Sequence, residues 1–237
     1  MPLEASSFQA RLSNVEGRIQ RAVERSGRRR SDLTLVAVSK KFSADSIRVA
    51  YAAGLREFGE NYVQEFAGKQ PQLQNLTGAR FHLIGHLQSN KARHACELFQ
   101  VIQTADSAKL LKRLDAAAAE QGVALEVFLE VKLSGEESKT GAEPDQLPEL
   151  LDTAAACPAL RVTGLMTMPP WSEDAEQSRP YFKRLAELAG RLGLSQLSMG
   201  MSNDFEVAIE EGATLIRVGT ALFGPRPKPQ KAESPRS

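Results

Sequence analysis

The sequence predicts an α/β protein that folds as a single (β/α)8 barrel of the TIM type, with an extra helix at its N-terminus. Eight short apolar runs alternate with segments of helical periodicity, which is the pattern of parallel strands joined by helices. A length of 237 residues suits one such barrel. An open doubly wound sheet is the alternative, but no G-x-G-x-x-G follows the first strand, which disfavours a dinucleotide fold.

The barrel and its N-terminal helix are expected to take up residues 1–224. The helix is predicted over residues 6–26 by apolar side chains at three- and four-residue spacing, and Gly27 ends it. The first strand follows at Thr34–Lys40, where an uninterrupted apolar run indicates a strand buried on both faces. Between them, the basic cluster Arg28–Arg30 is interpreted as a solvated connector rather than an RNA contact.

Helices and strands then alternate, each marked by local signals. Ser43 caps the next helix and Gly54 closes it, and Ser107 and Gly122 do the same for a later helix striped with leucine. The remaining strands are expected at 55–60, 81–85, 99–104, 125–133, 160–166, 196–199 and 213–219. The helices between them are expected at 43–53, 61–73, 89–98, 107–122, 144–156, 174–192 and 202–211.

Two segments carry further information. The strand at 125–133 alternates strictly, with charged residues on one side, as suits the lumen or the mouth of a small barrel. Residues 225–237 contain four prolines and mixed charges, so a disordered tail is expected there.

Composition narrows the class of protein. With 42% hydrophobic and 25% charged residues and a formal net charge of +1, the chain resembles an ordinary soluble globular protein and gives no case for nucleic acid. No apolar run approaches the length of a membrane span, and the N-terminus lacks the apolar core of a signal peptide.

Cys96 and Cys157 are far apart and in no CxxC motif, so reduced thiols in a cytoplasmic protein are expected. We also expect a monomer.

Lys40 is the first candidate for a functional residue. It follows a buried strand at its carboxyl end, where α/β folds build their active sites. A lysine that is partly desolvated there becomes a nucleophile for carbonyl compounds. The alternative is that Lys40 and Lys41 merely solvate the end of the strand.

Two other segments look suited to a phosphate group. Gly200 and Ser202 follow the seventh strand, at the start of a predicted short helix with free N–H groups, and Gly219 and Thr220 follow the eighth. Barrels often bind phosphate after these two strands. Together with a lysine across the mouth, the two segments suggest pyridoxal 5′-phosphate held as a lysine Schiff base.

The same segments carry a resemblance to a known family. The motifs are Ala37-Val-Ser-Lys40, Phe58-Gly-Glu-Asn-Tyr62, His82-Leu-Ile-Gly-His-Leu-Gln-Ser-Asn-Lys91, Gly164-Leu-Met-Thr-Met168, Leu197-Ser-Met-Gly-Met-Ser202 and Ile216-Arg-Val-Gly-Thr-Ala-Leu-Phe-Gly224. In this order they resemble the pyridoxal-phosphate homeostasis proteins, single-domain relatives of the alanine racemase barrel. The resemblance covers about residues 30–224.

The resemblance implies roles for the residues at the mouth. Lys40 would form the Schiff base, Asn61 would lie beside the cofactor, and Arg217 would face the pyridine nitrogen. The phosphate would be held by Ser202, Gly219 and Thr220. Lys132 stands where the family usually has a small polar residue, often asparagine.

Metal binding is not expected. His82 lies in a predicted strand and His86 beyond it, so these two of the three histidines do not share a face as ligands on a helix would. The methionines around residues 166–168 and 199–201 are interpreted as packing around the barrel mouth.

Two classes of function remain. One is a pyridoxal-phosphate-dependent amino-acid racemase of the alanine racemase type, in which a second domain brings a tyrosine as the opposite-face base. The other is a binding protein that stores, buffers or delivers the cofactor, with apo forms of pyridoxal-phosphate enzymes as partners. Here the chain ends after one barrel, and among its three tyrosines only Tyr62 is expected at the mouth. We therefore predict a carrier without catalytic residues.

Overall fold

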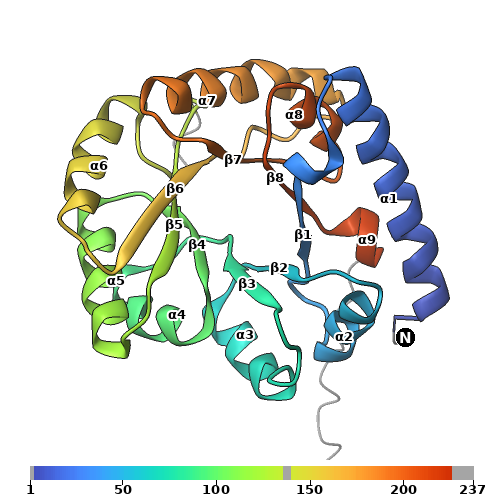
Figure 1. Ribbon diagram of the computed structural model, residues 1–237, viewed down its shortest axis with the longest axis horizontal. Coiled ribbons are helices and arrows are strands. Elements are labelled where there is room, and N and C mark those ends of the chain that lie inside the picture. The colour runs from blue at the N-terminus through green and yellow to red at the C-terminus, as the bar shows by residue number, and fades with distance from the viewer. Residues whose placement is uncertain (1–2, 136–139, 226–237) are drawn as a thin grey trace, which may run out of the picture.

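Eight parallel strands close into a barrel, each followed by helical segments on the outside, in the computed structural model (Figure 1). The structure describes residues 3–135 and 140–225. The strands are β1 (Thr34–Val38), β2 (Glu57–Glu60), β3 (Arg80–Leu83), β4 (Val101–Ala105), β5 (Leu125–Glu130), β6 (Leu160–Met166), β7 (Gln196–Met201) and β8 (Leu215–Val218). β8 pairs in parallel with β1, with Thr34 opposite Leu215, and this pairing completes the ring.

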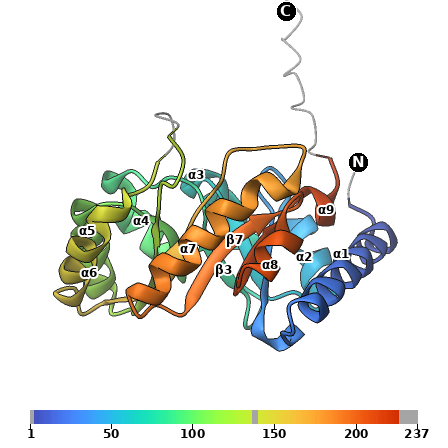
Figure 2. The ribbon, with the colours of Figure 1, turned by 90° about the horizontal axis from the view of Figure 1, so that it is seen from above.

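The helices form the outer layer. They are α1 (Ala5–Arg25), α2 (Ala44–Ala52), α3 (Val63–Lys69), α4 (Ala92–Leu98), α5 (Ala108–Gln121), α6 (Leu147–Ala155), α7 (Arg179–Arg191), α8 (Phe205–Glu210) and α9 (Thr220–Phe223). Short 3-10 turns precede or extend several of them. Figure 2 shows the barrel edge-on, with the helices packed around its side. The predicted (β/α)8 barrel with its extra N-terminal helix is therefore confirmed.

Local signals place the helix ends where the sequence predicts them. The Ser43 hydroxyl accepts a hydrogen bond from the backbone N–H of Ser46, and Ser107 caps α5 in the same way. Gly122 ends α5 in the left-handed conformation at a φ of 67°, which a residue with a Cβ rarely adopts. Each capping side chain satisfies an N–H group that has no partner inside its helix.

The barrel has two apolar layers because successive strand residues face opposite sides. Most buried apolar residues lie between the strands and the helices. A smaller cluster fills the lumen and consists of Val36, Val101, Phe128, Met166 and Leu215. On β5 the charged residues Glu126 and Glu130 are buried on the same side as Phe128, as the alternation predicts.

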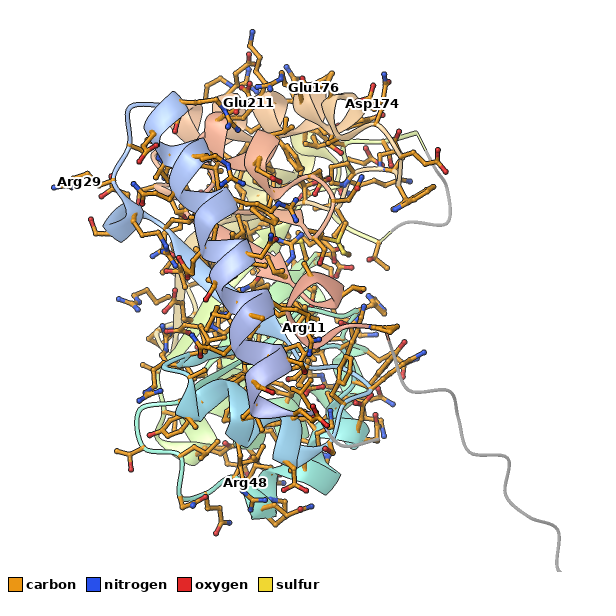
Figure 3. All side chains as sticks on the ribbon, turned by 90° about the vertical axis from the view of Figure 1, so that its right-hand side faces the viewer. Arg11, Arg29, Arg48, Asp174, Glu176 and Glu211 are labelled. Atoms are coloured by element: carbon orange, nitrogen blue, oxygen red, sulfur yellow. The ribbon has the colours of Figure 1, made fainter. Side chains whose placement is uncertain are left out.

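The N-terminal helix α1 lies along the outside of the barrel next to α8 and α9 (Figures 1 and 3). Phe8 packs against Phe223 with ring centroids 5.4 Å apart, and Arg11 donates a hydrogen bond to the backbone carbonyl of Leu222. α1 therefore covers the segment that carries the predicted phosphate residues, at the seam where β8 meets β1.

The connector after α1 differs from the prediction. The Arg28 guanidinium donates to the backbone carbonyls of Ile209 and Ala213, and Arg30 pairs with Glu16. Only Arg29 of the three arginines is largely exposed, with 82% of its side chain accessible. The cluster thus ties α1 to the end of α8 and is not a solvated connector throughout.

Several element boundaries also differ. The strand predicted at 125–133 ends at Glu130, after which Val131 makes an isolated bridge to Ala142. The helix predicted at 61–73 begins at Val63 and loses its α geometry after Lys69. The tail predicted at 225–237 lies outside the described residues except for Pro225. Within the described residues, no helix is both long and apolar enough to cross a membrane.

Candidate functional site

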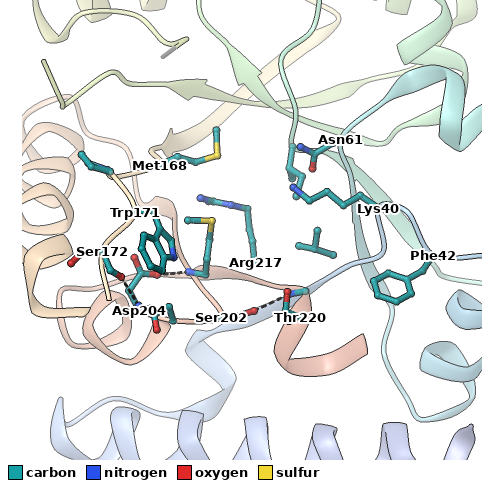
Figure 4. Close-up of a pocket in the computed structure, with 16 residues that line it drawn as sticks. Lys40, Phe42, Asn61, Met168, Trp171, Ser172, Ser202, Asp204, Arg217 and Thr220 are labelled. Atoms are coloured by element: carbon teal, nitrogen blue, oxygen red, sulfur yellow. Dashed lines mark hydrogen bonds between the residues drawn. The ribbon is translucent and has the colours of Figure 1, made fainter. Parts of the chain in front are cut away.

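A pocket of about 270 Å³ lies at the carboxyl ends of the strands (Figure 4). Six of its lining residues are those predicted from the sequence: Lys40, Asn61, Ser202, Arg217, Gly219 and Thr220. They come from the ends of β1, β2, β7 and β8, which the closed barrel brings to one mouth. The structure therefore brings all six together.

Lys40 is aimed into the pocket by the turn that follows β1. Lys41 adopts the left-handed conformation at a φ of 66°, uncommon for a residue with a side chain, and its backbone N–H donates to the Glu65 carboxylate at 2.6 Å. The turn leaves Lys41 exposed, whereas the Lys40 amine points into the pocket beside Asn61 (Figure 4). The two adjacent lysines thus have different environments.

A buried network fixes the start of this turn. The Ser39 hydroxyl donates to Glu60 Oε1 at 2.7 Å, and Lys69 Nζ contacts the same oxygen at 2.9 Å and Glu65 at 2.6 Å. Burial raises the pKa of Glu60, although the charge of Lys69 opposes this effect. Lys69 was not identified from the sequence, where its only signal is its position four residues after Glu65 on a helix.

Asn61 presents an acceptor without a partner. Its Oδ1 atom is buried and makes no hydrogen bond within the described residues. Gly85 allows this placement, because a Cβ at that position would lie 2.8 Å from Asn61 Cα. A buried acceptor without a partner costs free energy, which a ligand with a hydrogen-bond donor would recover.

Ser202 holds the loop after β8. Its Oγ accepts hydrogen bonds from the backbone N–H groups of Gly219 and Ala221, each at 3.3 Å. Thr220 begins α9, so its own N–H has no acceptor inside that helix. The hydroxyl of Ser202 and the first turn of α9 therefore form one wall of the pocket.

One expectation about this wall is wrong. The helix predicted to start at Ser202 is α8, and it starts at Phe205, because the Asp204 carboxylate accepts the Met201 N–H at 2.7 Å and holds residues 201–204 in a turn. Gly200 allows close packing against α8, since a Cβ there would lie 2.5 Å from the Cβ of Ala208.

Arg217 forms the floor of the pocket. Its guanidinium donates to Ser198 Oγ at 2.6 Å and to the Thr167 carbonyl at 2.9 Å, and it points toward Met168 across from Lys40 (Figure 4). Burial lowers the pKa of Arg217 to about 10, while the carboxylates of Asp204 and Glu130 oppose this shift. The guanidinium therefore stays charged at neutral pH.

The loop after β6 supplies residues that the sequence analysis missed. Trp171 and Ser172 line the pocket together with Asp204, whose Oδ2 accepts from the Ser178 hydroxyl at 2.8 Å. Trp171 is the chain's only tryptophan and is 75% exposed. The signal available in the sequence was a lone tryptophan directly after two prolines, a segment that cannot continue a strand or a helix.

The methionines divide among three environments. Met168 and Met201 line the pocket, as predicted for the mouth. Met166 instead fills the lumen, and Met199 packs in the outer core.

A second cavity of about 380 Å³ adjoins the first and shares Met168, Trp171 and Met201 with it. Glu130 and Lys132 line this cavity. Burial raises the pKa of Glu130 to about 7, and Lys132 Nζ lies 3.6 Å from a carboxylate oxygen of Glu143. The lysine that departs from the family pattern is therefore paired at the cavity's edge.

The histidines do not come together. His82 lies buried in the lumen between Glu57 and Gln103, whereas His86 is exposed, 3.8 Å from Asp106. Among the described residues there is no group of three or more metal-ligating side chains.

Comparison with known proteins points to one family. The sequence profile described as "Alanine racemase, N-terminal domain" matches residues 11–227. The chain is 44% identical to the pyridoxal phosphate homeostasis protein of Aquifex aeolicus over 91% of this chain and 97% of the relative. It is also 44% identical to the protein of that name from Pseudomonas aeruginosa, over 93% and 96%.

A solved structure agrees with these matches. PipY of Synechococcus elongatus, with PLP bound, is 39% identical and superposes with a TM-score of 0.80. The match covers 92% of this chain and 100% of that one.

Proposed function

The chain belongs to the family of pyridoxal phosphate homeostasis proteins, and on this premise we propose that it holds pyridoxal 5′-phosphate in the pocket at the mouth of its barrel. The observation that carries the proposal is the convergence on this pocket of Lys40, Asn61, Arg217, and the hydroxyl and glycine residues after β7 and β8. Pyridoxal phosphate supplies an aldehyde and an aromatic ring that withdraws electrons.

The residues present fit the parts of this cofactor. The Lys40 amine is the nucleophile that would form a Schiff base with the aldehyde. The Oδ1 atom of Asn61, which has no partner among the described residues, would accept a hydrogen bond from a donor at the edge of the ring. The wall formed by Ser202, Gly219 and Thr220 would offer the hydroxyl of Ser202 and the N–H and hydroxyl of Thr220 to the phosphate, and phosphate binding at such a wall is common in barrels.

Arg217 determines what the bound ring can do. Because its guanidinium stays charged, an Arg217 that faces the pyridine nitrogen disfavours protonation of that nitrogen. An unprotonated ring is a weaker electron sink for a carbanion. This electronic effect would weaken the ring's support for carbanion chemistry, but it does not by itself exclude racemisation.

Covalent binding is tested with a pair of lysine variants. We expect the purified protein to show the visible absorption band of a pyridoxal Schiff base, Lys40→Ala to lose it, and Lys41→Ala to keep it. Reduction with borohydride followed by peptide mass spectrometry locates the adduct. An adduct on Lys41, or on any lysine other than Lys40, contradicts the assignment.

The carrier function is supported by the side chains around the pocket. Of the described residues that line it, only Lys40, Asp204 and Arg217 are titratable. Asp204 already accepts hydrogen bonds on both carboxylate oxygens, and Tyr62 is 52% exposed and does not line the pocket. Racemisation needs a second base on the opposite face from the lysine, and these residues offer no clear one.

Exchange in deuterated water separates a carrier from a catalyst. We expect no inversion of L-alanine, L-serine or L-glutamate when the α-proton is followed by NMR with the cofactor-loaded protein. Inversion at about 1 s⁻¹ or faster, within the ordinary range for enzymes, contradicts the carrier proposal. Loss of that inversion in Tyr62→Phe would then identify the base.

We propose that the stored cofactor passes to apo forms of pyridoxal-phosphate enzymes. A Schiff base suits this role because it forms and hydrolyses reversibly. The expected cytoplasmic location fits the free thiols of Cys96 and Cys157. The monomeric state stays a prediction, which gel filtration with light scattering tests.

A further inference from the structure

A line of hydrogen-bonded side chains crosses the barrel lumen from the pocket to the opposite end. Its contacts are Arg217 Nη1 to Ser198 Oγ at 2.6 Å, Ser198 Oγ to Gln103 Oε1 at 2.6 Å, Gln103 Nε2 to His82 Nδ1 at 2.8 Å, and His82 Nε2 to Glu57 Oε2 at 2.5 Å. The five residues come from β8, β7, β4, β3 and β2. We call them the lumen line.

Because the residues of the lumen line are buried, each of their polar groups needs a hydrogen-bond partner inside the protein. Ser198 and Gln103 are fully buried, and His82 and Arg217 are 2% and 3% exposed. No bulk water reaches these groups to replace a partner, so each donor needs an acceptor within the line or beside it.

The direction of the line follows from the arginine and from the buried hydroxyl beside it. A guanidinium only donates, so Ser198 Oγ accepts from Arg217. The Ser198 proton is buried and needs an acceptor of its own, and the amide oxygen of Gln103 lies 2.6 Å away. The Gln103 amide then turns its NH2 group toward His82. His82 Nδ1 must therefore accept, which leaves the ring proton on Nε2, where it donates to Glu57.

The far end of the line is anchored by charges at the amino-terminal end of the barrel. Burial alone would raise the pKa of Glu57, but its hydrogen bond to His82, the charge of His82 when that ring is protonated, and the nearby Arg80 bring the pKa below its ordinary value. The Arg80 guanidinium lies 3.6 Å from Glu57 Oε1 and 2.8 Å from Glu126 Oε2. The same Glu126 oxygen lies 3.1 Å from Arg161 Nη2. The line thus ends on a carboxylate that is ionised at neutral pH.

A second proton on His82 is incompatible with this direction. Both ring nitrogens would then donate, and the Gln103 amide would have to turn its oxygen toward the ring and its NH2 group toward Ser198. The Ser198 proton would lose its acceptor in the line while Arg217 still donates to the same oxygen. The protonation state of His82 and the setting of Arg217 are therefore coupled.

From this geometry we infer that Ser198, Gln103 and His82 are positioning residues that hold the Arg217 guanidinium in one orientation toward the ligand pocket. Through Ser198 and Gln103, the orientation of this guanidinium is coupled to the position of the proton on the His82 ring. The ligand named here rests on the proposed function, whereas the direction of the line does not. The line gives the pocket a connection to the opposite face of the barrel.

The direction of the line is tested on the protein without cofactor. The chain has three histidines, so long-range 1H–15N NMR of the ¹⁵N-labelled protein resolves their ring states, and His86→Gln and His94→Gln assign the His82 signals by elimination. At about pH 8, above the unperturbed range of histidine, we expect the Nε2–H tautomer for His82. An Nδ1–H tautomer, or a mixture of the two, overturns the inference.

Two substitutions at Gln103 separate the loss of its hydrogen bonds from the mere change of a buried side chain. Gln103→Glu keeps an acceptor for Ser198 but can only accept from His82, so we expect His82 to become doubly protonated at the same pH while Arg217 keeps its place. Gln103→Leu removes the acceptor and cuts the line. If His82 keeps the wild-type tautomer in Gln103→Glu, the coupling is wrong.

The effect on the pocket is read from Trp171, whose fluorescence reports a titration with pyridoxal 5′-phosphate. We expect Gln103→Leu to weaken binding about tenfold, as for one misplaced charge-assisted hydrogen bond, and Gln103→Glu to bind within about twofold of wild type, a difference below 0.5 kcal/mol. Equal weakening by both variants overturns the positioning role.

A second variant covers a failure of Gln103→Leu to fold. Ser198→Ala removes one of the two acceptors of the Arg217 guanidinium and leaves the direction of the Gln103 amide unset, so we expect mixed His82 tautomers and weakened binding. A wild-type tautomer together with wild-type affinity in Ser198→Ala overturns the inference. Failure of every form to bind the cofactor would contradict the proposed function alone, because the tautomer still tests the line.

Discussion

Glu130 should make the protein less stable as the pH rises, and Glu130→Gln should remove this effect. Glu130 ends β5 with its side chain in the lumen, only 2% exposed. Its Oε1 accepts a hydrogen bond from Thr140 at 3.1 Å, whereas its buried Oε2 has no partner among the described residues. Burial raises the pKa of Glu130 from 4.5 to about 7, and Asp106 adds to the shift while Thr140 and Arg217 oppose it.

The sign follows from proton binding. Between pH 4.5 and about 7 the folded state holds a proton on Glu130 that the unfolded state has released. The stability that this proton provides is fully present below the pKa of Glu130 in the unfolded state. It is lost as the pH rises through the pKa of Glu130 in the folded state. At 1.36 kcal/mol per pH unit, a shift from 4.5 to about 7 corresponds to about 3 kcal/mol.

Urea unfolding at about pH 4 and at about pH 8, on either side of this window, measures the effect. Glutamine resembles a protonated glutamate in shape, so we expect wild type and Glu130→Gln to differ little at the lower pH. At the higher pH the variant should be more stable by up to about 3 kcal/mol.

The control removes the same formal charge elsewhere. Glu149 is exposed on α6, so Glu149→Gln should leave the pH dependence as it is in wild type. All other titrating groups cancel in the comparison between variant and wild type. A Glu130→Gln protein that loses stability with pH as steeply as wild type would refute the reasoning.

Three further predictions concern the pocket and the core. Ser202→Ala combined with Thr220→Val should weaken retention of pyridoxal 5′-phosphate by roughly 2–4 kcal/mol and spare unphosphorylated pyridoxal; equal loss in titrations of both ligands would argue against a phosphate wall. Lys69→Met leaves the buried Glu60 without its cation and should cost about 3–5 kcal/mol in urea unfolding; a loss below about 1 kcal/mol would show that the pair is not needed. Phe66 lies 4.5 Å and 5.0 Å, between ring centroids, from two other phenylalanines, so Phe66→Ala should lower the free energy of unfolding by about 3–5 kcal/mol; a loss within about 1 kcal/mol would mean that the site collapses around the change.

The order and kind of the elements were predictable because their signals are local. Caps at Ser43 and Ser107 and the left-handed Gly122 act within a few residues of the helix ends that they define. The strict alternation along β5 predicted which of its side chains enter the lumen, because a closed barrel has only an inside and an outside.

The predicted start of a helix was wrong where a side chain binds a backbone N–H group and holds the preceding residues in a turn. Asp204 directs its carboxylate back to the Met201 N–H, so the turn replaces the first residues of the helix expected from Ser202. The same competition could not be read from the sequence, since aspartate also occurs as an ordinary N-cap.

The six predicted site residues lie together because each ends or follows a strand, and parallel strands end on one side. The support beneath them was not predictable. Gln103 and Ser198 lie 95 positions apart in the chain and touch only after the barrel has closed. Glutamine and serine in short strands carry no local signal that they will be fully buried.

The lumen explains how a single guanidinium can be kept charged at the pocket floor. At the amino-terminal end, Glu57 and Glu126 are paired with Arg80 and Arg161, so their charges compensate one another. The middle of the lumen holds an apolar cluster and the neutral side chains of Gln103 and Ser198. Arg217 therefore has neutral groups below it, and the carboxylates of Asp204 and Glu130 favour its charged form. A ligand with acceptor atoms at the carboxyl end would add to this compensation.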